Sequence, residues 1–229
     1  MTEILFVILA LIGFYLYIVI AWALRCGSYS KILSKKIEKF YHLKTAYNKQ
    51  ILMIGDSVMH GVGATAVSHS LPALVAQHAP HVRVNVFAQD GARCFELVEL
   101  LEREHFEKQD QVIIFCGGMD VIKFTSKKKI KEDLGKLFSI AKTISTNVTY
   151  ISPFNIGNSP LFLPPLSYLY AYRSKIFFKI AKKCTEEYGV TYLDYYHSKN
   201  DNFAEDRSHP NDKGYKHIFN LLKDQIIPS

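Results

Sequence analysis

The chain has 229 residues, of which 48% are hydrophobic and 21% charged, so it can form one ordinary folded domain and is not intrinsically disordered. Its net charge is +7, but seven Lys and Arg side chains and only one acid lie within residues 25–50, which leaves the rest of the chain close to neutral. A nearly neutral domain binds nucleic acid poorly, so we expect no nucleic-acid partner.

The first predicted element is an uncharged apolar stretch at residues 4–24. As a helix it is long enough to cross the hydrocarbon of a bilayer, about 30 Å. A buried core helix and a cleaved signal peptide are the alternatives. Core helices are seldom apolar on every face, and signal peptides carry positive charge before the apolar run. We therefore predict an uncleaved transmembrane anchor at residues 1–25.

A basic segment follows the anchor at residues 26–49. Positive charge on this side predicts a single-pass membrane protein whose following domain faces the cytoplasm. Residues 30–46 have the pattern of a basic amphipathic helix, which either lies on anionic lipid or packs on the domain as a solvated linker. We expect membrane contact through residues 4–24 and this basic segment, and we predict a folded domain at residues 50–229.

From residue 50 onward, short apolar runs alternate with helical patterns. Strands are predicted at 51–54, 82–88, 112–115, 148–151 and 190–193, and helices at 95–101, 128–144, 167–188 and 210–227, the last with Pro210 in its first turn. Such alternation indicates a parallel sheet covered by helices on both faces. Ligands bind these sheets at the carboxyl ends of the strands, so we expect the functional residues there.

Residues able to perform acyl transfer follow these strands. Ser57 follows the first strand, Gly91 follows the second, and Asp206 and His209 precede the last helix. A serine hydroxyl needs a base to become a nucleophile, and an aspartate near a histidine can hold the imidazole in the required tautomer. The backbone N–H groups of Ser57 and Gly91 are candidate donors to an oxyanion. Asp56 is expected to cap the following helix.

Taken together, these segments resemble the SGNH/GDSL hydrolase family. The resemblance is carried by Ile51–Ser57 with Gly61 and Gly63, by Asp90-Gly91-Ala92, and by Phe203–Asn211 with Gly214 and Tyr215. It implies a flavodoxin-like three-layer α/β/α sandwich with a five-stranded parallel sheet, here preceded by one transmembrane helix. It also implies ester hydrolysis through an acyl-serine intermediate, with Ser57, His209 and Asp206 as catalytic residues and no metal or other cofactor.

One position departs from the family pattern. The family's third segment is Gly-x-Asn-Asp, whose Asn side chain is a third oxyanion donor, but here Met119 stands at the Asn position. Met has no N–H to donate, and loss of one such donor costs roughly 10²–10³ in rate. Three explanations stay open. Asn155, after the fourth strand, supplies the amide; the enzyme is slow; or the protein binds without turnover.

The predicted function is a membrane-anchored serine esterase or lipase-type hydrolase that cleaves a small-molecule or lipid ester. The alternatives are a catalytically weak or inactive binding or accessory protein, and an acyltransferase that uses the same serine. Met119 and Asn155 are predicted to line the substrate site. The segment 153–172, rich in Pro, Leu, Phe and Tyr, is either an apolar acyl-binding wall, a membrane-facing lid or ordinary helix packing.

The four cysteines are scattered and form no C-x-x-C pair, so we expect free, mostly buried thiols and no zinc site. The histidines outside the predicted catalytic residues form no ligand-like cluster, and no metal is expected. The sequence does not predict an oligomeric state.

Overall fold

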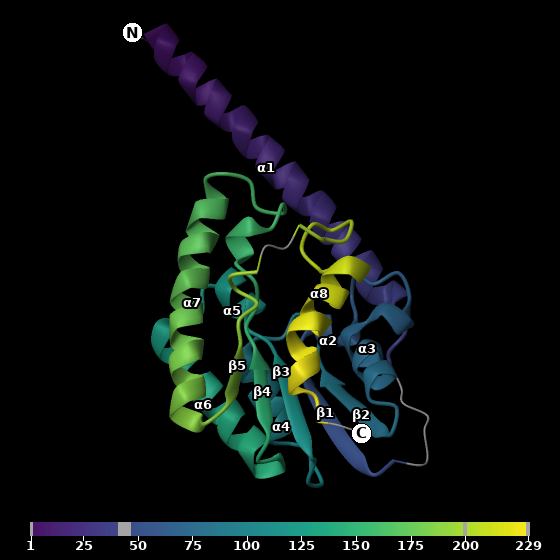
Figure 1. Ribbon diagram of the computed structural model, residues 1–229. Coiled ribbons are helices and arrows are strands. Elements are labelled where there is room, and N and C mark those ends of the chain that lie inside the picture. Colours follow the sequence, from purple (N-terminus) through teal and green to yellow (C-terminus); the bar gives the residue numbers. More distant parts are fainter. Residues whose placement is uncertain (1, 41–46, 199–200, 228–229) are drawn as a thin grey trace.

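A computed structural model describes residues 2–40, 47–198 and 201–227 (Figure 1). Its centre is a five-stranded parallel sheet in the order β2-β1-β3-β4-β5. The strands are β1 (Lys49–Gly55), β2 (Val82–Ala88), β3 (Gln111–Phe115), β4 (Val148–Ile151) and β5 (Thr191–Leu193). The chain moves outward from β1 to β2 and then crosses back to β3. This reversal opens a crevice at the carboxyl ends of β1 and β3, where ligands of such sheets bind.

Helices cover both faces of the sheet. The helices of the described residues are α1 (Thr2–Lys36), α2 (Ser57–His60), α3 (Leu71–His78), α4 (Cys94–Leu101), α5 (Gly118–Ile122), α6 (Lys127–Ile144), α7 (Leu166–Tyr188) and α8 (Asp212–Leu222), with short 3₁₀ turns at Val67–His69, Ile156–Asn158 and Lys223–Gln225. In Figure 1, α3 and α8 lie in front of the sheet, α4 and α6 lie behind it, and α7 lies beside α6 near the β5 edge. The predicted three-layer α/β/α sandwich is confirmed.

The core lies between the sheet and its helices because the strands are apolar on both faces. All five residues of β3 are buried, as expected for a central parallel strand. On α6, buried residues recur with helical spacing, and Leu134, Leu137 and Phe138 are fully buried. The ring of Phe138 meets that of Tyr150 on β4 edge to face, with ring centres 5.3 Å apart. This packing holds the strand ends, and the loops that follow them, in fixed positions.

Two predicted helices have different bounds in the structure. Residues 30–36 are helical as the end of α1, so the amphipathic helix predicted at 30–46 is confirmed only as far as Lys36. Residues 37–40 are not helical, and residues 41–46 lie outside the described residues. The helix predicted from Pro210 begins at Asp212. Pro210 instead forms an isolated antiparallel bridge with Phe203, and the Asn211 side chain caps the helix by accepting from two backbone N–H groups. The sequence analysis also missed α3.

The long helix α1 has two halves in different surroundings. Figure 1 shows its first half extending away from the sandwich, and side chains there such as Phe6 and Leu11 are exposed. The helix is long and apolar enough to cross a membrane, with a mean hydropathy of 2.9 in its most apolar window. Its second half lies across the carboxyl edge of the sheet, where Cys26 is buried. The helix therefore joins a spanning-length segment directly to the crevice.

Candidate active site

Ser57 lies at the carboxyl end of β1, as the first residue of α2. The chain turns sharply there because Asp56 caps the helix, its Oδ1 accepting a hydrogen bond of 3.0 Å from the Val58 N–H. Asp56 is buried, and burial raises the pKa of its carboxyl to about 6. The aspartate beside Ser57 therefore serves the helix cap, as predicted, and the turn presents the Ser57 hydroxyl to the crevice.

His209 and Asp206 form a line of hydrogen bonds with Ser57. The Ser57 Oγ lies 2.8 Å from His209 Nε2, and His209 Nδ1 lies 2.5 Å from Asp206 Oδ2. The second oxygen of Asp206 accepts from the backbone N–H groups of Ser208 and His209, each at 3.0 Å. Burial alone would raise the pKa of Asp206, but the hydrogen bonds and charge of His209 outweigh it and hold that pKa below its ordinary value. The structure thus brings together all three predicted catalytic residues.

The loop that carries His209 is pinned against the segment after β1. Within the loop, the Ala204 N–H donates to the His209 carbonyl at 2.8 Å. Gly63 approaches it closely at a φ of +98°, and a Cβ at that position would lie 2.4 Å from the Pro210 carbonyl oxygen. Only glycine fits both the backbone conformation and this contact. The Tyr215 hydroxyl of α8 donates a 2.7 Å hydrogen bond to the Val62 carbonyl, so the helix that follows the His209 loop is also tied to the segment after β1.

A pocket of about 600 Å³ opens beside the hydroxyl of Ser57. Gly91, Met119 and His209 line it together with Ser57. A smaller pocket of about 60 Å³ is lined by Ser57, Met119 and His209 as well. Gly91 follows β2 with a φ of +69°, a left-handed conformation that suits glycine. The predicted oxyanion donors and Met119 are therefore placed around the same hydroxyl.

Asn155 is not brought to this position. Its Oδ1 accepts from the Gly157 N–H at 3.1 Å and caps the 3₁₀ turn Ile156–Asn158. It is not among the residues that line either pocket beside Ser57. In this arrangement no amide of Asn155 stands in for the donor that Met119 lacks.

The sequence analysis missed a polar cluster next to Gly91. Asp90 receives a hydrogen bond from the Ser34 hydroxyl on α1, and its other oxygen lies 2.6 Å from His60 Nδ1. The hydrogen bond with His60 is the main reason why the pKa of Asp90 lies below its ordinary value. The sequence analysis named Asp90 in the segment Asp90-Gly91-Ala92. No local pattern indicated its hydrogen-bond partner Ser34, which lies 56 residues earlier in the chain.

The remaining candidates lie apart from this chemistry, except that Cys26 lines the larger pocket. All four cysteines are free and buried, as expected, and the Sγ atoms of Cys94 and Cys116 lie 3.6 Å apart. Asp120, next to Met119, is buried and accepts from the Cys94 N–H at 2.9 Å, which ties α5 to α4. Within residues 2–40, 47–198 and 201–227, no group of three or more His, Cys, Asp or Glu side chains could hold a metal ion.

Comparison with known proteins agrees with this geometry. Residues 53–217 match the family described as GDSL-like lipase/acylhydrolase. No curated protein matches the chain.

Solved structures share the fold at low sequence identity. A lipase/acylhydrolase from Enterococcus faecalis is 20% identical, with a TM-score of 0.59 over 80% of this chain and 99% of that one. The esterase EstA from a Pseudoalteromonas species, inhibited by monoethylphosphonate, is 18% identical, with a TM-score of 0.60 over 78% and 97%. An extracellular lipase from Streptomyces rimosus is 16% identical, with a TM-score of 0.60 over 78% and 100%.

Proposed function

The chain belongs to the GDSL-like lipase/acylhydrolase family, and on this basis we propose that it is a serine esterase that cleaves a carboxylic ester through an acyl-serine intermediate. The observation that carries the proposal is the unbroken line of contacts from the Ser57 hydroxyl through His209 to the buried carboxylate of Asp206. Such a line makes a serine hydroxyl nucleophilic, because the imidazole can accept its proton.

In the proposed reaction, Ser57 Oγ attacks the ester carbonyl while its proton moves to His209 Nε2. The proton then passes from Nε2 to the leaving alcohol, and an acyl-serine remains. His209 next takes a proton from water, whose oxygen attacks the acyl carbonyl. The bond between Ser57 Oγ and the acyl group then breaks, His209 returns the proton to Ser57 Oγ, and the acid is released. Asp206 stays ionised throughout, since its pKa is held low, and it accepts the Nδ1–H so that Nε2 faces the serine.

The negative charge on the carbonyl oxygen would be stabilised by the backbone N–H groups of Ser57 and Gly91. Both residues line the larger pocket. Met119, which also lines it, contributes no donor, so the proposed oxyanion site has two donors rather than three. We expect turnover to be slower than a third donor would allow.

The absence of a donor on Met119 favours a second candidate, a protein that binds an ester without turning it over. In that case the pocket and the fold are retained, but two donors are too few for useful catalysis. The two candidates differ in whether Ser57 is needed for any hydrolysis at all.

The proposed setting is the membrane. The first half of α1 is long and apolar enough to span a bilayer, and a basic segment follows it. We propose a single-pass protein anchored by this half, with its domain on the cytoplasmic side in accordance with the positive-inside rule. The substrate would then be a small-molecule or lipid ester within reach of the bilayer surface.

The test is hydrolysis of a short-chain nitrophenyl ester by the full-length chain in detergent. We expect turnover that is lost in Ser57→Ala and retained in Ser139→Ala, a serine of α6 whose hydroxyl bonds to the Gly135 carbonyl. Equal hydrolysis by the wild type and Ser57→Ala would contradict the esterase proposal. Binding of ester without any Ser57-dependent turnover would favour the second candidate.

A further inference from the structure

The second half of α1 forms one wall of the pocket that contains Ser57. The α1 residues on this wall share one face of the helix, recurring every three or four positions: Ala23, Cys26, Gly27, Ser30, Lys31, Ser34 and Lys35. The facing wall holds Ser57, Gly91 and His209. The pocket therefore lies between α1 and the carboxyl edge of the sheet rather than within the sandwich alone.

Two hydrogen bonds attach α1 to the loops at the two ends of this pocket. Near the apolar half, the Trp22 indole N–H donates to the Pro160 carbonyl at 3.1 Å. About three turns further along, roughly 18 Å at helical rise, Ser34 donates to Asp90, which precedes Gly91. The helix is thus fixed to the wall of the pocket at one end and to the proposed oxyanion loop at the other.

The pocket differs in character along the helix. At the end nearer the apolar half of α1, Ala23 of the helix and Leu161 and Phe162 of the domain line it. At the other end, Lys31 and Lys35 line it beside Asp90. An apolar group would be favoured at the end that continues toward the spanning-length segment, and a polar group at the end away from it.

Size separates the two pockets beside Ser57. The smaller one, about 60 Å³, is far below the size of pockets that bind small organic ligands, so it is too small for a long acyl chain. The larger one, about 600 Å³, is of the size that binds small organic ligands. A long acyl group attached to the ester carbonyl at Ser57 fits only in the larger pocket.

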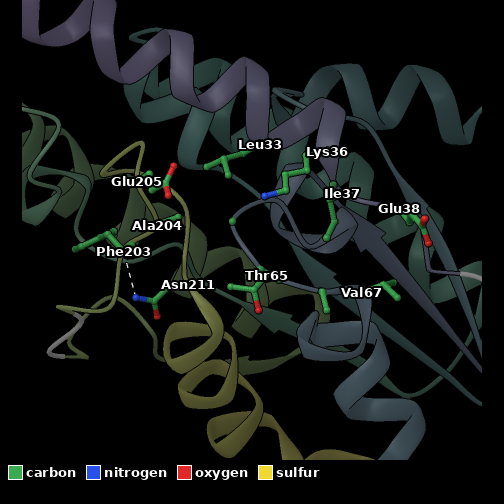
Figure 2. A pocket seen from close by; sticks show the side chains of 13 residues that line it. Leu33, Lys36, Ile37, Glu38, Thr65, Val67, Phe203, Ala204, Glu205 and Asn211 are labelled. Atoms are coloured by element: carbon green, nitrogen blue, oxygen red, sulfur yellow. Dashed lines mark hydrogen bonds between the residues drawn. The ribbon is translucent and has the colours of Figure 1, made fainter.

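Another cavity touches α1 but holds none of the proposed catalytic residues. Figure 2 shows it between the end of the helix, at Leu33 and Lys36, and the segments around Thr65 and Phe203. Its volume is about 540 Å³, but Ser57, His209 and Asp206 are not among its lining residues. The acyl group of a substrate under attack by Ser57 therefore belongs in the larger pocket described above.

This wall lies outside the part of the chain that the family match covers. The match begins at residue 53, whereas the α1 residues of the pocket end at Lys35. The wall is thus not part of the segment that matches the family.

We propose that the second half of α1 is a wall of the acyl-binding site, and that the site takes an ester with a long acyl chain lying between α1 and the loop 160–162. The inference rests on the proposed esterase function and gives its substrate class. It makes Gly27 a specificity-determining residue: no atom lies within 4 Å of a Cβ built there, so the site has open space that a side chain can fill.

The test compares Gly27→Phe with Gly13→Phe in the full-length chain. Gly13 lies on the same helix and also has open space around its Cβ, but it does not line the pocket. Hydrolysis of nitrophenyl acetate and nitrophenyl decanoate is measured for both variants in detergent. We expect Gly27→Phe to lower kcat/KM for decanoate by about tenfold or more relative to acetate, and Gly13→Phe to leave the ratio unchanged. Retained acetate turnover shows that the variant is folded.

The possible results separate this inference from the proposed function. An unchanged decanoate-to-acetate ratio in Gly27→Phe and in a second variant at the apolar end, Ala23→Phe, overturns the acyl placement alone. An equal loss on both esters also overturns it, because the added ring then acts on something other than chain length. Absence of Ser57-dependent hydrolysis in the wild type overturns the esterase function and this inference with it.

Discussion

The two sides of the catalytic pocket are built from different kinds of structure. On the sheet side, Ser57, Gly91 and His209 stand on short loops after strands, and several hydrogen bonds hold each loop. On the α1 side, one helix lies across the opening, attached through Trp22 and Ser34. The sheet side carries every group that would make or break bonds. The α1 side carries groups that would shape what reaches them, together with Ser34, which holds the loop before Gly91.

This difference separates chemistry from selection. Changes on the sheet side should alter the rate for every ester, because each acts on the reacting atoms or on the fold that holds them. Changes on the α1 side should alter rates modestly, and changes in its pocket lining, such as at Gly27, should do so in a way that depends on the substrate. The following predictions test that division, from the largest expected effect to the smallest.

The largest effect is expected for Asp206→Asn on the sheet side. An amide cannot stabilise the imidazolium and favours the wrong tautomer of His209, so kcat should fall by about 10⁴. The chain offers a matched control in Asp194, which also bonds to a histidine three residues on, His197 Nδ1 at 2.7 Å, but at the surface. Kinetics on a short ester should show no loss for Asp194→Asn. A similar small effect in both variants would remove Asp206 from the proposed mechanism.

The next effect concerns the buried cap of Ser57's helix. Because burial raises the pKa of Asp56 to about 6, the folded state binds its proton more tightly than the unfolded state, and this contribution to stability is lost as pH rises from about 4 through about 6. Asp56→Asn keeps the capping oxygen and cannot ionise. The free energy of unfolding of Asp56→Asn, measured relative to that of the wild type, should rise by up to about 3 kcal/mol between about pH 4 and pH 7. Thermal unfolding in detergent measures this, and a difference independent of pH would contradict it.

A gain is expected from Met119→Asn, also on the sheet side. The new amide would add a third donor beside Ser57, and turnover of a short ester should rise at least about tenfold, the low end of the effect of one donor. Asn155→Ala is the control, because its side chain caps the 3₁₀ turn and does not line the pocket; its kcat should stay within about twofold. Unchanged turnover in Met119→Asn would count against a two-donor site, and a large loss in Asn155→Ala would identify that residue as the missing donor.

The smallest effect is expected for Ser34→Ala on the α1 side. Loss of its hydrogen bond to Asp90 should loosen the loop before Gly91 and lower kcat by about two- to tenfold, with KM for a short ester little changed. Ser28→Ala is matched, because that hydroxyl bonds only within the helix, to the Leu24 carbonyl at 2.9 Å. Ser34 would be a positioning residue if kcat falls without a change in the melting temperature. A fall in both variants, or in neither, would contradict that role.

Much of the sheet side could be predicted from the sequence. Apolar runs ending in glycine or polar residues predicted the strand ends, and the parallel sheet brings those ends to one edge. The motif Asp-x-x-His was not sufficient by itself, since it occurs at both Asp194–His197 and Asp206–His209. The fold distinguishes them, because only the second pair reaches Ser57.

The α1 side could not be predicted in the same way. The sequence analysis treated residues 26–49 as a basic segment that either lies on anionic lipid or packs on the domain as a solvated linker. The pocket uses the helix face with Gly27, Ser30 and Ser34, whose small side chains carry no strong pattern. Its position depends on contacts between segments far apart in the chain, such as Trp22 with Pro160, and no local periodicity encodes them.

The central claim is that His209 activates Ser57. Its most direct test is labelling of the full-length protein with a fluorophosphonate, followed by mapping of the modified residue. The account predicts a single adduct on Ser57 that is absent from Ser57→Ala and strongly slowed in His209→Ala. A folded protein that forms no adduct, or forms it on another residue, would contradict the account.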